Sequence, residues 1–308
     1  MKNNRLDNLC NSIRESVKDC CSDNVSIAFS GGIDSTLIAY LAKDYCNTEL
    51  IAVGTTNAYD LDAAESAANL IDMQIKKIVV TPEEMLLEAL EMKKRINMST
   101  IEIEFMTPFW IAAKNASNKI LMCGQGADEL FGGYARFRNR KLENNLRLEV
   151  ENLLNRLPDR EKKITDLFGL KLECPYLSKI TVKTAELFSQ KERIGNTGKA
   201  ILREAALKME LPKEIAMRKK KAAQYGSGSQ KAIKKTNKHR LELNIEFESD
   251  EVAKAVMVAT EPENKGWIET NLEGKKLTAT LRSHTIGSLK ETAEDFMACV
   301  TVAKGISK

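Results

Sequence analysis

The segment VSIAFSGGIDSTLIAYLAK, residues 25–43, constrains the fold more than any other part of this chain. It joins an apolar strand to a helix through two adjacent glycines, Gly31 and Gly32. Glycine adopts positive φ angles easily and lets another group come close to the main chain. The pair therefore indicates a bound ligand, and the alternative is a plain strand-to-helix turn.

Polar groups around these glycines favour a ligand that is an anion. Ser30, Asp34 and Ser35 surround the start of the predicted helix, whose first N–H groups have no partner within the helix. Such a helix N-terminus is a binding site for anions. Because the segment lacks the G-x-x-x-x-G-K-S/T pattern of the common nucleotide P-loop, it need not hold the β- and γ-phosphates of a hydrolysed nucleotide.

Strands and helices alternate from the N-terminus to Cys123, which predicts an α/β fold. We expect a doubly wound, mostly parallel sheet with its ligand crevice at the carboxyl ends of the strands. The predicted strands are VSIAF, ELIAVGTT, IKKIVV and KILMC. Helix starts are predicted at two capping boxes, Asp62 with Glu65 and Thr81 with Glu84, and at Pro108 as a first helical residue.

A change in composition marks a domain boundary, since the basic run KAIKKTNKHR has no obvious apolar face. We predict a first domain over residues 1–232, a basic linker over 233–240 and a small α+β domain over 241–308. Hydrophobic periodicity in the last domain predicts the order strand, helix, strand, strand, helix. Because one face of so small a sheet would stay exposed, we expect pairing with another copy or another protein.

Composition excludes several classes of protein. The 308 residues are 43% hydrophobic and suit a globular protein. Seven cysteines without a C-x-x-C pair argue for reduced thiols and against a metal cluster, and two histidines argue against a Ser-His-Asp triad or a zinc site rich in histidine. No apolar N-terminal stretch or long apolar run is present, so we expect a cytoplasmic location and no membrane contact.

Two motifs carry a family resemblance. SGGIDS resembles the pyrophosphate loop of the ATP pyrophosphatases, and CGQGADELFGGYARF (residues 123–137) resembles the GEGADELFGGY signature of the synthetase domain of asparagine synthetases. The resemblance implies an adenine nucleotide alpha hydrolase-like fold and a site for ATP and Mg²⁺. The metal-binding aspartates of the family fall at Asp34 and Asp128, and the nucleotide-binding residues at Ser30, Gly31, Gly32, Asp34, Ser35, Gly124 and Gly126.

A third match lies downstream, in MRKKKAAQYGSG. Lys220 falls where the family carries a lysine that stabilises the charge developing in acyl transfer, and the competing interpretation is a solvated basic run. Together the motifs extend the resemblance over residues 5–232.

The chain also departs from the family. The glutamate of GEGADE is Gln125 here, and a family arginine falls at Glu104. Lys171 and Glu173 stand where the family shows the opposite charges. These differences predict a changed acceptor pocket, with Gln125 and Glu104 among the catalytic residues and with aspartate rejected. No cysteine follows Met1, so we expect ammonia or an amine to come from solution or from a partner.

The predicted C-terminal domain resembles the small dimerising subunit of the KEOPS complex, which works on tRNA. The resemblance rests on the element order and on the run LTATLRSHTIGSL, and it implies a homodimer or a KEOPS-like partner. Residues 241–308 carry 8 Lys and Arg against 12 Asp and Glu, a net charge of −4. Because the whole chain has a net charge of +4, residues 1–240 carry +8. A tRNA contact is therefore expected on the basic body, and the alternative is a solvated face; its candidate residues are Arg136, Arg138, Arg140, Lys141, Lys231, Lys234, Lys235 and Lys238.

These observations lead to one hypothesis and two alternatives. The hypothesis is an asparagine synthetase-like ligase that splits ATP to AMP and pyrophosphate, adenylates a small-molecule acceptor and transfers ammonia or an amine to it. The alternatives are an ammonia-dependent asparagine synthetase and a non-catalytic nucleotide-binding scaffold in a tRNA-modifying assembly. The residues leave the acceptor and the nitrogen donor open.

Overall fold

The computed structural model divides the chain into two compact units, residues 1–230 and 231–308. It describes residues 2–133, 159–196, 198–218, 226–235, 239–264, 268–283 and 286–306. Within these ranges, no helix combines the length and the apolar character that a membrane span requires. The seven cysteines all lie in these ranges, and each carries a free thiol.

Five parallel strands form the sheet of the first unit, in the order β3-β2-β1-β4-β5. Their bounds are Asn24–Ala28 for β1, Asn47–Thr55 for β2, Ile75–Val80 for β3, Ile120–Met122 for β4 and Lys171–Glu173 for β5. The chain builds outward from β1 to β3 and then returns to add β4 and β5 on the other side. The strand order therefore reverses between β1 and β4, where open α/β sheets bind their ligands. The predicted doubly wound, parallel α/β fold is confirmed.

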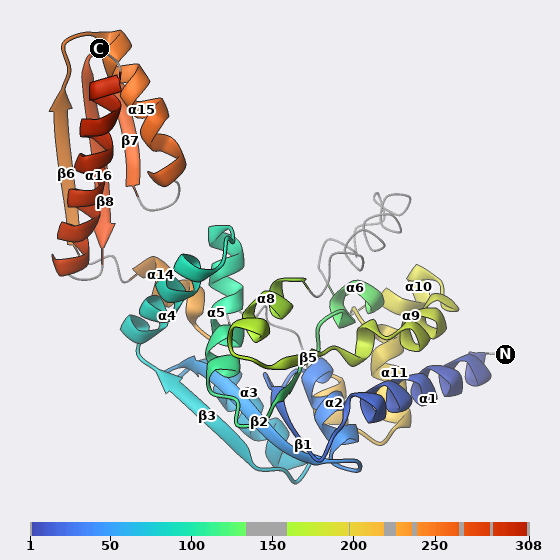
Figure 1. Cartoon of the computed structure of the whole chain (residues 1–308). Helices are drawn as coiled ribbons and strands as arrows, with labels where there is room; N and C mark the ends of the chain where they lie inside the picture. The colour runs from blue at the N-terminus through green and yellow to red at the C-terminus, as the bar shows by residue number, and fades with distance from the viewer. Residues whose placement is uncertain are drawn as a thin grey trace. The chain divides into compact units, whose positions relative to one another are not determined.

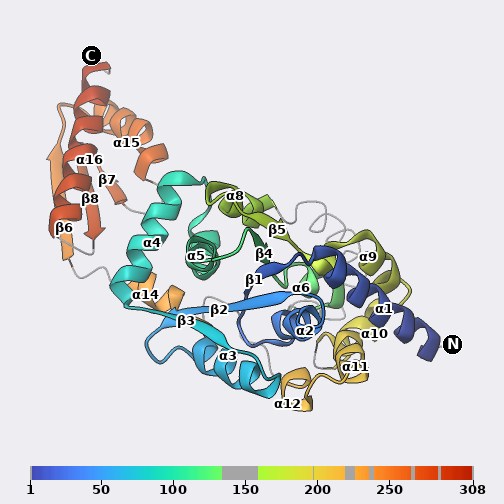
Figure 2. The same cartoon turned by 60° about the horizontal axis from the view of Figure 1, so that its bottom comes forward.

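Helices cover both faces of this sheet. Figure 2 shows α3 on one side of β2 and β3, with α4 and α5 on the other. The helical elements of the first unit, including the 3-10 helix η3, are α1 (Lys2–Cys20), α2 (Ile33–Ala42), α3 (Tyr59–Leu70), α4 (Pro82–Arg95), α5 (Thr100–Lys114), α6 (Ala127–Phe131), α8 (Asp159–Leu167), η3 (Pro175–Leu177), α9 (Lys179–Glu186), α10 (Gln190–Ile194), α11 (Ala200–Lys208) and α12 (Lys213–Ala216), and α14 (Ser229–Lys235) begins at the boundary between the units.

Buried apolar side chains hold β1 and α2 in place. Val25 and Ile27 on β1, and Leu37 and Ile38 on α2, are completely buried in one core cluster. Each such side chain contributes about 1.5–3 kcal/mol relative to an exposed one. The loop between β1 and α2 is therefore anchored at both ends.

Two of the three predicted helix starts, those of α3 and α5, differ from the structure, whereas the start of α4 agrees with it. The predicted box at Thr81 and Glu84 is confirmed, since the Glu84 amide donates to Thr81 Oγ1 at 3.1 Å. The box at Asp62 is wrong, because a turn in which the Ala58 amide donates to the Thr55 carbonyl starts α3 at Tyr59 instead. Asp62 then lies in the first turn, where a carboxylate favours the helix dipole.

The start of α5 also differs from the prediction. A capping box of Ser99 and Glu102 begins the helix, and Pro108 lies inside it. A proline has no N–H, so the carbonyl four residues earlier, on Glu104, loses its helical donor. The hydroxyl of Ser229 donates to that carbonyl at 2.5 Å and replaces the missing bond. A tertiary contact thus makes an internal proline tolerable.

The second unit contains the predicted strand, helix, strand, strand and helix. These are β6 (His239–Glu246), α15 (Asp250–Asn264), β7 (Ile268–Glu273), β8 (Lys276–Ser283) and α16 (Ile286–Ile306). The three strands are antiparallel in the order β6-β8-β7, and α15 and α16 pack on one face (Figure 1). Leu241, Leu243 and Ile245 pack against the core under the helices, whereas Glu242 and Asn244 between them are exposed.

The edge of β6 leads to a prediction about oligomeric state. Within the described sheet β6 pairs with β8 alone, and an open strand edge is a template for pairing with another chain. We expect the full chain to associate through this unit, and deletion of residues 241–308 to yield a monomer. Light scattering measures the mass of both forms, and circular dichroism checks that the shortened chain folds. An unchanged oligomeric mass after deletion contradicts the prediction.

Candidate functional site

The loop after β1 has the geometry of an anion site. Gly31 has φ +68°, and a Cβ there would collide with the Ala63 backbone, so a glycine is required. Gly32 is the N-cap of α2 and makes no side-chain capping bond. Ser35 Oγ accepts from the Ser30 amide at 3.2 Å, which folds the loop over the start of the helix. The free N–H groups and the helix dipole then favour a bound anion.

Arg218 fixes this loop from outside. Its guanidinium donates to the carbonyls of Gly31 at 2.8 Å and Ala63 at 2.7 Å. The two bonds join the phosphate-type loop to the start of the segment that contains the third sequence motif. Arg218 is part of the motif MRKKKAAQYGSG, but the motif itself does not indicate that Arg218 binds the loop after β1.

The loop after β4 comes close to the loop after β1. Gly124 lies against Asp34, and a Cβ on Gly124 would be 2.9 Å from Asp34 Cβ. Asp128 follows in the first turn of α6. The absence of a side chain at Gly124 therefore lets the carboxylates of Asp34 and Asp128 converge.

Lys199 lies between these two carboxylates. Its Nζ is 2.5 Å from Asp34 Oδ2 and 2.6 Å from Asp128 Oδ1, and the residue is 2% exposed. Burial alone would lower the pKa of Lys199, but the two carboxylates outweigh burial and raise its pKa above the usual value. Lys199 stays protonated and supplies one positive charge against two negative ones. Lys199 also has a left-handed backbone conformation, φ +56°, which costs free energy for a residue with a Cβ.

The second oxygen of Asp34 has acceptor capacity to spare. Asp34 Oδ1 is buried and accepts no hydrogen bond within the described part of the chain. The backbone carbonyl of Asp34 accepts from the buried hydroxyl of Tyr176 at 3.0 Å, which fixes the position of the residue. No group of three or more His, Cys, Asp or Glu side chains with metal-site geometry occurs among the described residues.

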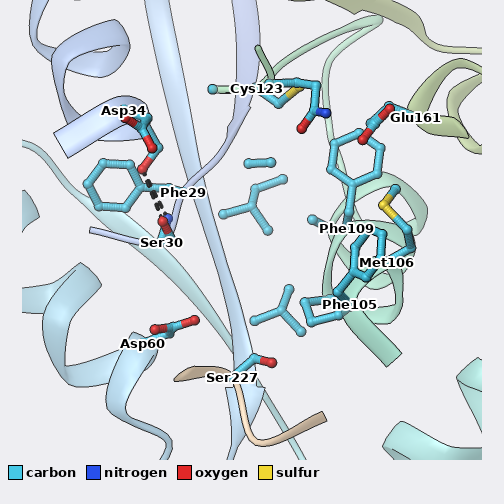
Figure 3. Close-up of a pocket in the computed structure, with 18 residues that line it drawn as sticks. Phe29, Ser30, Asp34, Asp60, Phe105, Met106, Phe109, Cys123, Glu161 and Ser227 are labelled. Carbon is cyan, nitrogen blue, oxygen red and sulfur yellow. Dashed lines mark hydrogen bonds between the residues drawn. The ribbon is translucent and has the colours of Figure 1, made fainter. Parts of the chain in front are cut away.

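A cavity of about 250 Å³ opens beside these loops, at the carboxyl ends of β1, β2 and β4 (Figure 3). Its walls include aromatic and aliphatic side chains, with a few polar groups, as in small-molecule sites. The lining residues include Phe29, Ser30, Asp34, Ile51, Val53, Asp60, Phe105, Met106, Phe109, Gln125, Glu161 and Ser227. In Figure 3, Ser30 and Asp34 face Phe109, Cys123 and Glu161 across the cavity.

The structure brings most of the predicted nucleotide-binding residues together. Of these, Ser30, Asp34, Ser35 and Gly124 line the cavity, and so does Gln125, which is a predicted catalytic residue. Gly31, Gly32, Gly126 and Asp128 belong to the same two loops without lining the cavity. Lys220 lies outside the described residues, as do the candidate RNA-binding residues Arg136, Arg138, Arg140, Lys141 and Lys238.

Three residues predicted for the acceptor pocket, Glu104, Lys171 and Glu173, are not among the residues that line this cavity. Glu104 is buried and accepts from Gln230 Nε2 at 2.9 Å, and it is not among the lining residues. Lys171 is exposed and pairs with Glu173 at 2.6 Å, also outside the lining. Glu104 therefore supports the wall through α5, whereas Gln125 faces the cavity directly. Lys171 and Glu173, which both differ in charge from the family, form an ion pair with each other on β5.

Lys199 and Glu161 are the site residues that sequence reasoning missed. Lys199 comes from the start of α11 and Glu161 from the first turn of α8, far from either glycine motif. Neither has a neighbouring motif residue in the sequence. Only the folded chain brings them to the site.

Comparison with known proteins gives a consistent result. The protein-family model described as asparagine synthase matches residues 8–148 and 139–261 of the chain. The chain is 35% identical to "Putative asparagine synthetase (glutamine-hydrolyzing) 1" of Methanocaldococcus jannaschii, covering 70% of this chain and 48% of that protein. It is 25% identical to asparagine synthetase B of Escherichia coli K12, covering 71% of this chain and 45% of that protein. The chain thus spans about half the length of the curated relatives it matches.

Among solved structures, the chain is similar to the NMN synthetase of Francisella tularensis. The TM-score is 0.39 and the identity 15%, over 73% of this chain and 77% of that one. A similarity at this level carries no argument about the activity.

The contacts of Lys199 predict a large loss of stability in Lys199→Met. The substitution leaves two converging carboxylates without their counter-charge, and removal of one partner from a buried ion pair costs about 3–5 kcal/mol. Denaturant unfolding in EDTA measures this loss. We expect Lys199→Met with Asp34→Asn to lose less than Lys199→Met alone.

The control is Lys208→Met, which removes an exposed ion pair with Asp7. Such surface pairs contribute about 0–1 kcal/mol, so this control stays near the parent. Equal losses in Lys199→Met and Lys208→Met contradict the role assigned to Lys199.

Proposed function

The chain belongs to the asparagine synthase family, and we propose that it is a ligase that splits ATP to AMP and pyrophosphate, adenylates a small-molecule acceptor and transfers ammonia or an amine to it. The observation that carries the proposal is the convergence of Asp34 and Asp128 at the reversal of strand order, beside an apolar cavity. Carboxylates at a phosphate-type loop suit metal-bound phosphates more than an uncharged ligand.

In the proposed complex the nucleotide spans the two loops. The pyrophosphate portion lies on the Ser30–Ser35 loop at the N-terminus of α2, and Lys199 adds a buried positive charge. The adenine base packs between Ile51 and Val53 of β2 and the aromatic residues of α5. The α-phosphate then faces Gln125 and the remaining volume of the cavity.

The carboxylates of Asp34 and Asp128 fit a magnesium ion. Both already converge on one cation, and Asp34 Oδ1 keeps a free acceptor position in a buried setting. Magnesium bound there would neutralise the phosphate charge as pyrophosphate leaves. Asp34 and Asp128 would hold it, with substrate oxygens completing its ligands.

The other proposed roles follow from chemistry and from the family motif. An acceptor oxygen attacks the α-phosphorus, and nitrogen then displaces AMP from the adenylated acceptor. Lys220 stabilises the oxyanion of that second step. Gln125 contacts the acceptor as a neutral amide, and Glu104 acts on the pocket through α5. A tRNA contact and a homodimer or KEOPS-like partner remain part of the proposal for the whole chain.

The products decide between this proposal and a scaffold. We expect turnover of ATP to AMP and pyrophosphate, measured by chromatography and a pyrophosphate-release assay across candidate acceptors, with and without tRNA. ADP and phosphate as products contradict the proposal, and nucleotide binding without any turnover across the panel favours the scaffold. Asp34→Asn is expected to abolish pyrophosphate release, whereas Lys208→Met serves as the matched surface control.

The acceptor pocket predicts that aspartate with ammonia is a poor substrate pair. Asp34, Asp60 and Glu161 line the cavity, and no described Lys, Arg or His lines it with them, so the carboxylates of aspartate would meet like charges, which is unfavourable. Aspartate-dependent pyrophosphate release should therefore be weak. Asparagine formation at roughly 1 per second or more would support the ammonia-dependent asparagine synthetase instead.

A further inference from the structure

Carboxylates supply the charge on the described wall of the cavity. Asp34, Asp60 and Glu161 line it, and no Lys, Arg or His is among the described residues that do. Asp34 pairs with Lys199. Asp60 lies beside Ser227, at the end of the cavity away from Glu161 (Figure 3). The three carboxylates thus mark different parts of the site, and the proposed nucleotide accounts only for the part near Asp34.

Glu161 is the carboxylate that the proposed function leaves without a role. The residue lies in the first turn of α8 and is 4% exposed. Its Oε2 is buried and accepts no hydrogen bond from any described residue, although the residue lines the cavity. In Figure 3 its carboxyl group lies on the same side as Cys123, next to the ring of Phe109.

Arg160 balances this charge only in part. Its Nη2 is 3.9 Å from Glu161 Oε1, which is too long for a hydrogen bond. The same guanidinium lies 3.7 Å from Glu102 and stacks over the ring of Phe105, at 5.0 Å from its centre. Arg160 is therefore shared among three groups, and its contact with Glu161 is to Oε1 and not to Oε2.

The remaining neighbours make the ionised form of Glu161 less favourable. Burial raises the pKa of Glu161, Arg160 and the backbone N–H of Glu161 itself lower it, and Glu129 on α6 and Asp159 on α8 raise it, so that the net shift is upward. The charge of Glu161 also raises the pKa of the nearby Cys174 thiol. A buried carboxylate without a full partner destabilises the folded chain, and such a cost is typical of groups that act on a ligand.

We propose that Glu161 binds the protonated amino group of the nitrogen donor and takes one of its protons. The inference rests on the proposed function and assigns a residue to its second half. An ammonium or primary ammonium group offers several N–H donors and a positive charge. Oε2 of Glu161 has no such partner among the described residues. One N–H bond breaks and one O–H bond forms on Glu161. The freed nitrogen lone pair attacks the acyl carbon, AMP leaves with the electrons of the C–O bond, and the second proton of the nitrogen passes to the phosphate of the leaving AMP.

The test measures cation binding and needs no acceptor. Thermal unfolding of the full chain is followed with Mg²⁺ and ATP, in ammonium chloride or in potassium chloride at equal ionic strength, at pH 8. Potassium carries the same charge but no N–H donors. We expect ammonium at about ten times its Kd to raise the Tm of the parent by on the order of 2–4 °C over potassium. We expect no such difference in Glu161→Gln.

Asp159→Asn is the matched control, because Asp159 is exposed in the same turn of α8. It should respond to ammonium as the parent does. An equal response in Glu161→Gln, or no response in the parent, overturns the inference. A rise in Tm with ATP in every variant shows that nucleotide binding stands even when the inference fails, whereas no response to ATP counts against the proposed function itself.

Two further measurements keep the test decisive. Methylammonium is the second cation, and a response to it as well as to ammonium indicates an amine donor, whereas ammonium alone indicates free ammonia. The response should also shrink as the pH falls from 8 toward the raised pKa of Glu161, because protonation removes the charge that attracts a cation. A response of the parent that does not change with pH overturns the inference even if Glu161→Gln fails to fold.

The sign of the stability change is also fixed. A carboxyl whose folded pKa is raised lowers stability as pH rises from the unfolded pKa to the folded one, and the loss is complete above both. Without ligands, Glu161→Gln should therefore have a higher Tm than the parent at pH 8, with a smaller difference at pH 5. A purely structural role for Glu161 would give a lower Tm at both pH values.

Discussion

The contact of the Lys199 ammonium with Asp34 and Asp128 is the interaction on which the site depends. It joins three segments that are distant in the sequence: the start of α2, the first turn of α6 and the residue before α11. Two carboxylates this close repel each other unless a cation lies between them. Lys199 therefore allows the carboxylates of Asp34 and Asp128 to lie close together. Because Lys199 is buried, salt screens these ion pairs much less than it screens pairs on the surface.

This arrangement also explains why the neighbouring backbone is so constrained. Gly124 leaves room for Asp34, and Arg218 ties the Gly31 carbonyl to the Ala63 carbonyl. On the other side of the cavity, the Ser229 hydroxyl replaces the hydrogen bond that Pro108 removes from α5. The walls are therefore fixed by side-chain bonds to main-chain carbonyls, and a ligand meets a preorganised surface.

The sequence predicted the parts of the fold that have local signals. Alternating strands and helices, the Thr81 capping box and the glycine motifs all depend on residues close together in the chain, and the structure contains them. The predicted start of α5 at Pro108 was wrong although Ser99 and Glu102 form a local capping box, and the contact that makes the proline tolerable inside the helix, from Ser229 to Glu104, spans more than a hundred positions. Lys199 and Glu161 could not be predicted for the same reason, since a single charged residue on a helix usually faces solvent. Only packing identifies the exceptions.

The distribution of charge separates the two halves of the proposed reaction. Near Asp34 and Asp128 a buried ammonium offsets the acids, which suits a phosphate chain and its metal. Near Gln125 and Glu161 the described wall has a neutral amide and an under-compensated carboxyl, which suits a cation and repels a carboxylate. A free aspartate would bring a second negative charge to this half, whereas an amine would bring the missing positive one. The same wall that disfavours aspartate therefore favours the nitrogen donor, and both effects come from Glu161 on α8 and from the Gln125 loop, not from the phosphate loop.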